Sequence, residues 1–167
     1  MATDGVSKRK EYSELMQEER DKIWKAIELN SVTDIQEALI NANIDINCYL
    51  TDYNWSPLHL AVELDKLEIV ETLLSRGADT EIKSQRLKTP LHVAAEMGHV
   101  EVIKLLLSSG ANVYALDQNS DSPLHLAVKE NKYNIVDFLV AARHIDISQL
   151  DMELKEKVEK MMKDNAK

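Results

Sequence analysis

The chain has 167 residues, a length that fits one ordinary domain, and its 44% hydrophobic and 29% charged residues suit a folded protein rich in aliphatic side chains. Its 29 acidic and 20 basic residues leave a formal net charge of −9, and such a field repels phosphate backbones and anionic lipid surfaces. We therefore expect neither nucleic acid nor a membrane as its partner.

Two further features concern the compartment in which the chain works. Cys48 is the only cysteine, so an internal disulfide and a cysteine zinc site are both excluded, which favours a reducing compartment. No apolar run approaches the roughly 18 residues of a membrane span, and the N-terminus MATDGVSKRKEY lacks the apolar core of a secretory signal. We expect a protein of the cytoplasm, with the nucleus as the alternative. Lys8, Arg9 and Lys10 are either part of a soluble tail, which we favour, or a nuclear import element.

The N-terminal segment is predicted to hold a mobile tail, residues 1–10, and a degenerate copy of a repeated unit, residues 11–50. In that copy Ala26 takes a helix position, Leu39 and Ile40 form the paired apolar positions, and Asn43 stands at a corner that needs positive φ. Residues 11–21 lengthen its first helix. We interpret this copy as an N-terminal cap with a solvated outer face.

A hexapeptide then recurs three times with the same spacing. SPLHLA begins at Ser56, TPLHVA at Thr89 and SPLHLA again at Ser122, so that the starts lie 33 residues apart, as 89 − 56 and 122 − 89 show. Each hydroxyl can cap a helix that begins at the following proline. One side of this short helix is apolar, with Leu58, Ala61 and Val62 in the first copy and Leu91, Ala94 and Ala95 in the second.

A second helix follows in each copy after a break at Asp65, Gly98 or Asn131. In the middle copy the pattern predicts an apolar face made of Val100, Ile103, Leu106 and Leu107. Gly77 and Gly110 come just beyond this helix, where glycine suits the positive φ of a C-terminal cap. The unit is therefore helix, turn, helix and protruding loop, over residues 51–83, 84–116 and 117–147.

The third copy loses its corner glycine around Arg143 and His144. Beyond it, apolar residues recur at spacings of three and four, at Ile147, Leu150, Leu154, Val158 and Met161. This pattern predicts a C-terminal capping helix over residues 148–163 that begins at Ser148, followed by a tail, residues 164–167.

From Asp52 to Ala142 the three copies resemble the ankyrin repeat, because a period of 33 residues and T-P-L-H at a helix start are typical of that family. The resemblance implies an all-α solenoid of stacked helix-turn-helix units with protruding hairpin loops, in a single domain over residues 11–163. One copy alone cannot bury its apolar face, whereas stacked copies form a continuous core.

The histidines are the strongest candidates for chemistry, and we interpret them as structural. His59, His92 and His125 share one repeat position, so they are expected roughly 10 Å apart, too far for a common metal ion, and each would brace its loop against its helix. His99 and His144 suggest no site. We expect no metal and no cofactor.

No catalytic motif is present, so we expect no enzyme. Asp121, Ser122 and His125 could be drawn as a hydrolase triad, but Ser122 is already assigned as a helix cap. An enzyme remains the formal alternative to a binding protein. It would need His59, His92 and His125 to point into a shared pocket together with acidic side chains. Cys48 is interpreted as a packed thiol.

The resemblance implies that the chain binds another protein through the loop tips and the exposed side of the first helices, a concave surface that we call the binding strip. Its residues are Asp52, Tyr53, Trp55, Glu63, Leu64, Gln85, Arg86, Lys88, Glu96, Met97, Gln118, Asn119, Asp121, Lys129 and Glu130. Tyr53, Trp55, Arg86 and Met97 are of types that are enriched in interface centres. Trp55→Ala or Arg86→Ala is expected to weaken binding by about 1 to 3 kcal/mol while leaving thermal stability nearly intact; the alternative for Trp55 is that it packs over the N-terminal cap.

Two roles remain open for such a monomeric binding module. One is an adaptor or stoichiometric regulator. The other is an inhibitor of a kinase or of a Rel-type transcription factor, a role that the resemblance to small ankyrin proteins implies. No degradation signal of the D-S-G-x-x-S kind precedes the copies, which slightly favours a constitutive binder.

Overall fold

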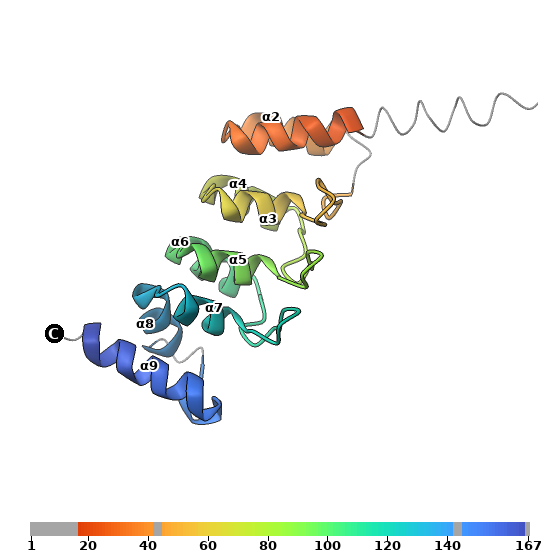
Figure 1. Cartoon of the computed structure of the whole chain (residues 1–167). Helices are drawn as coiled ribbons and strands as arrows, with labels where there is room; N and C mark the ends of the chain where they lie inside the picture. Colours follow the sequence, from red (N-terminus) through yellow and green to blue (C-terminus); the bar gives the residue numbers. More distant parts are fainter. Residues whose placement is uncertain (1–16, 42–44, 142–144, 166–167) are drawn as a thin grey trace, which may run out of the picture. The chain divides into compact units, whose positions relative to one another are not determined.

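The computed structural model describes residues 17–41, 45–141 and 145–165. The predicted tail at residues 1–10, the corner at Asn43 and the region around Arg143 and His144 lie outside these ranges. Contacts divide the chain after Ala78 into two compact units, which are described separately. Every regular element in the described ranges is helical, so the predicted all-α class is confirmed (Figure 1).

The first unit holds four described helices arranged as two pairs. They are residues 17–28, α2 (Val32–Asn41), α3 (Pro57–Glu63) and α4 (Leu67–Ser75). The first pair is the predicted degenerate copy, and α2 packs against α4. Its buried side chains include Ile23 and Ile27 on the first helix and Ile35 and Ala38 on α2.

One prediction for this copy is wrong. Leu39 and Ile40 were expected to form the buried pair, but 69% of Ile40 is exposed and Ala38 is buried. The reason is helical phase: once Ile35 faces the core, the residue three positions later shares that face, and this is Ala38.

The second unit continues with two more helix pairs and a C-terminal helix. Its elements are α5 (Pro90–Met97), α6 (Val100–Ser108), α7 (Pro123–Lys129), α8 (Tyr133–Ala141), the 3-10 turn Ile147–Gln149 and α9 (Met152–Asn165). Within this unit α5 packs against both α6 and α7, and α8 packs against α9. The loops before α5 and α7 project on the same side of their helices (Figure 1).

The repeated residues form the core as expected. Leu58, Ala61 and Val62 are almost wholly buried, and so are Leu91 and Ala94 in the second unit. In α6 the buried residues are Val102, Ile103 and Leu106, whereas Val100 and Leu107 are only half-buried. Two of the four residues predicted for the apolar face, Ile103 and Leu106, are therefore buried, and the centre of the buried face is rotated slightly toward Val102.

The predicted breaks and corners adopt the left-handed backbone conformation. Between the paired helices, φ is +53° at Asp65, +91° at Gly98 and +53° at Asn131, and beyond the second helices it is +88° at Gly77 and +91° at Gly110. Such values favour glycine and, among other residues, Asn and Asp. The turns are therefore encoded locally by residues that tolerate this conformation.

The C-terminal helix begins later than predicted. It starts at Met152 rather than at Ser148, which lies in the 3-10 turn. Asp151 is the better cap, because its Oδ1 accepts a hydrogen bond of 2.9 Å from the Leu154 backbone N–H. Leu154, Val158 and Met161 are buried, as the spacing predicted.

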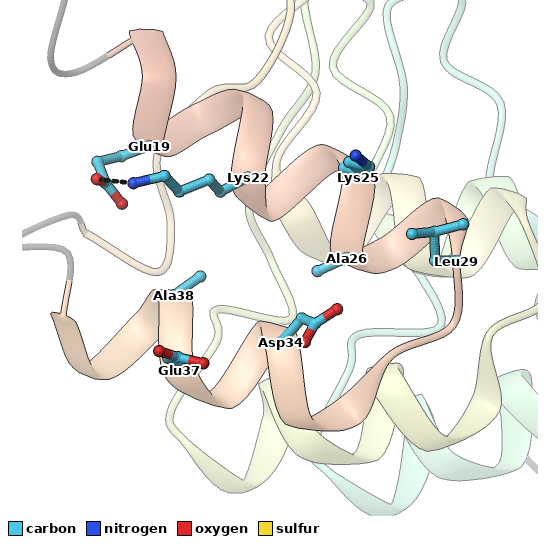
Figure 2. Close-up of a pocket in the computed structure, with 8 residues that line it drawn as sticks. All are labelled: Glu19, Lys22, Lys25, Ala26, Leu29, Asp34, Glu37 and Ala38. Carbon is cyan, nitrogen blue, oxygen red and sulfur yellow. Dashed lines mark hydrogen bonds and ion pairs between the residues drawn. The ribbon is translucent and has the colours of Figure 1, made fainter.

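The outer side of the first helix pair is polar. Its turn residue Asn30 corresponds to Asp65 of the next copy, and this correspondence aligns the two copies. In the alignment Lys25 takes the position of Leu60, and Asp34 takes the position of Ile69. Lys25 and Asp34 are exposed, whereas Leu60 and Ile69 are buried. A pocket of about 380 Å³ lies on this side. Figure 2 shows five of the residues that line it, with Lys25, Asp34 and Glu37 around Ala26 and Ala38. The charges fit a face that lies in solvent.

Candidate functional site: the hairpin loops and the first helices

Each copy closes its protruding loop as a tight hairpin. In the second unit the Leu87 N–H donates to the Ser84 carbonyl at 2.9 Å, and the Ser84 N–H donates to the Lys88 carbonyl at 3.0 Å. The next hairpin repeats both bonds, from Ser120 to Asp117 at 3.0 Å and from Asp117 to Asp121 at 2.9 Å. The backbone of these tips is thus held in one shape.

Backbone and side-chain bonds tie these two neighbouring hairpins to each other. The Gln118 N–H donates to the Arg86 carbonyl at 3.0 Å, and the Asn112 N–H donates to Glu81 Oε1 at 2.8 Å. Consequently, the side chains of Arg86 and Gln118, both exposed, are presented from adjacent points of one framework.

The histidine of each hexapeptide braces its own hairpin, as predicted. His59 Nδ1 lies 2.9 Å from the Ser56 hydroxyl, and His125 Nδ1 lies 2.8 Å from the Ser122 hydroxyl. His92 Nδ1 lies 2.8 Å from the Thr89 hydroxyl and accepts from the Thr89 N–H at 3.1 Å. These bonds join the helix to the residue that precedes it.

His92 also bridges two copies within the second unit. Because its Nδ1 accepts the Thr89 N–H, the ring proton belongs on Nε2, which donates to the Asp121 carbonyl at 3.0 Å. Burial lowers the pKa of His92 from its ordinary 6.5, and the bond to the Asp121 carbonyl opposes that shift. The neutral ring therefore connects α5 to the next hairpin.

Two ion pairs occupy equivalent positions with their charges exchanged. Lys88 Nζ lies 2.6 Å from Glu96 Oε2, and one repeat later Lys129 Nζ lies 2.5 Å from Asp121 Oδ2. In each pair one residue precedes the helix cap and the other lies near the end of the same helix. The lysine is the more buried partner in the first pair, and the aspartate in the second.

The residues of the binding strip differ in exposure. Asp52, Tyr53, Leu64, Gln85, Arg86, Met97, Gln118, Asn119, Lys129 and Glu130 are exposed, Trp55, Glu63, Lys88 and Glu96 are half-buried, and Asp121 is buried. Only 6% of Asp121 is exposed, because its carbonyl accepts from His92 and its carboxylate pairs with Lys129.

Trp55 has a contact inside the first unit. Its ring lies 5.8 Å from the His59 ring, centroid to centroid, at an angle of 40°. Trp55 thus covers the histidine that braces its hairpin, and this contact gives it a part in the fold whatever it binds.

Exposed apolar residues that the sequence pattern did not single out also lie in the second unit. Leu87 is 45% exposed at the tip of its hairpin, Tyr114 is 52% exposed and Leu116 is 51% exposed. The repeat alignment could have identified Leu87, because the other copies have the polar residues Asn54 and Ser120 at the same position and Leu87 is the apolar exception.

Within the described ranges, no group of three or more His, Cys, Asp or Glu side chains is placed to hold a metal ion. Burial raises the pKa of the Cys48 thiol, which disfavours its thiolate form. In the same ranges no helix is both long and apolar enough to cross a membrane.

Packed helix pairs, left-handed turns at glycine or asparagine and helix starts capped with the help of a histidine define a helical-repeat protein. The family model described as ankyrin repeats (3 copies) matches residues 8–84 and 81–151. The chain therefore belongs to the ankyrin-repeat family.

Two curated relatives share part of this sequence. The chain is 36% identical over 62 residues to the 2-5A-dependent ribonuclease of Mus musculus, which covers 37% of the chain and 8% of that protein. It is 31% identical over 68 residues to the same ribonuclease of Homo sapiens, which covers 41% of the chain and 9% of that protein. The matched segment spans less than a tenth of either relative.

Proposed function

We propose that the chain is a non-enzymatic module that binds another protein through its hairpin tips and the exposed side of its first helices. Ankyrin repeats are generally protein-protein interaction modules. The observation that carries the proposal is the pair of tied hairpins in the second unit, since the bond from Gln118 to Arg86 fixes a framework whose polar side chains remain exposed.

A framework that is rigid before binding loses little conformational entropy when a partner docks. Arg86 and Gln118 lie on this framework, Met97 ends the helix α5 that follows the first of the two hairpins, and all three are exposed. Arginine and methionine are enriched at interface centres, so these side chains are the proposed contacts. The matching tip in the first unit offers Tyr53, 69% exposed.

The finer role that we propose is an adaptor or a stoichiometric regulator, monomeric by itself, in the cytoplasm or nucleus. The alternative remains an inhibitor of a kinase or transcription factor. The ribonuclease activity and the 2-5A dependence named for the relatives are not extended to this chain, because the match covers under a tenth of their length.

The test compares proteins co-purified with the wild-type chain, with Arg86→Glu and with Lys160→Glu, each quantified by mass spectrometry. Lys160 is an exposed cation on α9, so its reversal makes the same charge change outside the binding strip. A partner retained by wild type and Lys160→Glu but lost by Arg86→Glu, and then bound directly as purified protein, supports the proposal. Equal recovery with all three chains counts against it.

A further inference from the structure

Leu87 has a backbone conformation that its side chain disfavours. Its φ is +57°, in the left-handed region, and the two equivalent hairpins place Asn54 at +56° and Ser120 at +64°. A bulky side chain in this region is an outlier that destabilises the fold, whereas asparagine tolerates the conformation better and glycine adopts it freely.

The surrounding bonds prevent this strain from relaxing. The Leu87 N–H and the Ser84 N–H both close the hairpin, and the Lys88 N–H also donates to Ser84 Oγ at 3.2 Å. The neighbouring residue, Arg86, is held by Gln118 of the next hairpin. The left-handed conformation is therefore imposed by the loop, whatever side chain stands at position 87.

Nearly half of this apolar side chain is not used in packing, because Leu87 is 45% exposed. A strained backbone position that persists with an exposed apolar residue points to a role outside folding.

The residues of this tip carry only positive charges, and two acids near it, Glu81 and Glu96, are engaged with the Asn112 N–H and with Lys88. Between Ile82 and Thr89 the chain carries Lys83, Arg86 and Lys88 and no acid, in a protein whose formal net charge is −9. Lys88 pairs with Glu96, but Lys83 and Arg86 are exposed and take part in none of the ion pairs found among the described residues. A cationic tip with an apolar side chain at its end fits an acidic ligand that carries an apolar anchor.

We propose that Leu87 is the apolar contact of a docking tip, flanked by Lys83 and Arg86, for a short acidic segment of a partner protein that presents a hydrophobic side chain. The proposal rests on the proposed protein-binding function and names the chemistry of the partner at one end of that surface. Carboxylates on the partner meet the two cations while its apolar side chain packs on Leu87.

The test uses a displayed library of random peptides selected on the full-length wild-type chain. Selected peptides are then synthesised, and their affinity is measured by fluorescence anisotropy for wild type, Leu87→Gly, Arg86→Glu and Ser120→Gly. Ser120→Gly is the matched control, because it changes the equivalent left-handed position of the next hairpin.

The expected peptides are acidic with an apolar residue. Leu87→Gly should weaken their binding by about tenfold or more while raising the thermal midpoint, since glycine removes the strain and the contact together. Ser120→Gly should leave affinity unchanged. Opposite effects on stability and binding distinguish a contact residue from a folding residue.

Several results would overturn the proposal: failure to select any peptide, peptides without acidic residues, an affinity that Leu87→Gly leaves intact, or a lower thermal midpoint in that variant. A single-stranded RNA oligonucleotide serves as a second probe. Tight binding of that probe that needs Arg86 but not Leu87 would also overturn it, in favour of a polyanion site. If co-purified partners depend on Arg86 but not on Leu87, this proposal fails while the proposed function stands.

Discussion

Lys88 and Glu96 form an ion pair whose charges are exchanged, one repeat later, between Asp121 and Lys129. The two copies therefore use the same geometry with opposite polarity. Since only 17% of the Lys88 side chain and 34% of the Glu96 side chain are exposed, the attraction is less screened than in a surface pair.

This relationship supplies a double-mutant test. Glu96→Gln removes the carboxylate that pairs with half-buried Lys88 and should lower the free energy of unfolding by about 1 kcal/mol. The double variant Lys88→Asp with Glu96→Lys copies the arrangement of Asp121 and Lys129, so it should lose less stability than the sum of its two single variants. Urea unfolding of Lys88→Asp, Glu96→Lys and the double variant measures this coupling, and a double variant as unstable as the summed singles would assign the effect to packing of the aliphatic parts of the side chains.

His92 should make stability depend on pH. Its pKa is lowered by burial in the folded chain, so the unfolded chain binds the proton first as the pH falls through about 6.5. The contribution of His92 is complete above that pH and declines below it until the folded ring is also protonated.

The measurement is the urea midpoint at about pH 7.5 and about pH 5.5 for wild type and His92→Asn. Wild type should lose more stability on acidification than the variant, because asparagine does not titrate. Identical losses would mean that the ring at position 92 takes up its proton equally in both states.

Arg86 and Trp55 should separate binding from folding. Arg86→Ala removes an exposed side chain and should change stability by no more than about 0.5 kcal/mol while weakening partner binding by about 1 to 3 kcal/mol. Trp55→Ala should also destabilise the fold, by about 1 to 2 kcal/mol, since its ring packs on His59. Thermal unfolding and calorimetric titration of each variant with an identified partner check this contrast.

Asp151 should control the start of α9. Its carboxylate accepts the Leu154 N–H, which lowers the pKa of Asp151, and lies 3.5 Å from His125 Nε2. Asp151→Ala should speed amide hydrogen exchange in the first turns of α9, whereas Asp151→Asn, which keeps the accepting oxygen, should exchange more slowly than the alanine variant. Unchanged exchange in the alanine variant would assign the helix start to packing of Leu154.

Local rules account for the parts of the fold that could be predicted. Ser56 and Pro57 specify a helix start, and Gly98 or Asn131 specifies a left-handed turn, because each depends on a few neighbouring residues. The exposure of Ile40 was missed because the phase of a degenerate helix is set by what it packs against. The start of α9 at Met152 was missed because the sequence pattern favours Ser148 as the cap, whereas Asp151 accepts the Leu154 N–H.

The candidate site was only partly predictable for a similar reason. The register identified Arg86 and Gln118, but not the bond between their hairpins. Asp121 was assigned to the binding strip because its copies are loop residues, and its burial depends on contacts with His92 and Lys129. Leu87 carries no turn signal of its own, so its conformation follows from the hairpin rather than from the residue.

Lys25 and Asp34 have a consequence for the behaviour of the protein in solution. They stand at positions where the neighbouring copy has buried aliphatic residues, and they make polar a face that would otherwise be hydrophobic. Exchanging Lys25 for leucine and Asp34 for isoleucine would create an exposed hydrophobic patch on this face, and molecules would be expected to associate head to tail or to precipitate. The two charged side chains are therefore expected to disfavour self-association through this face.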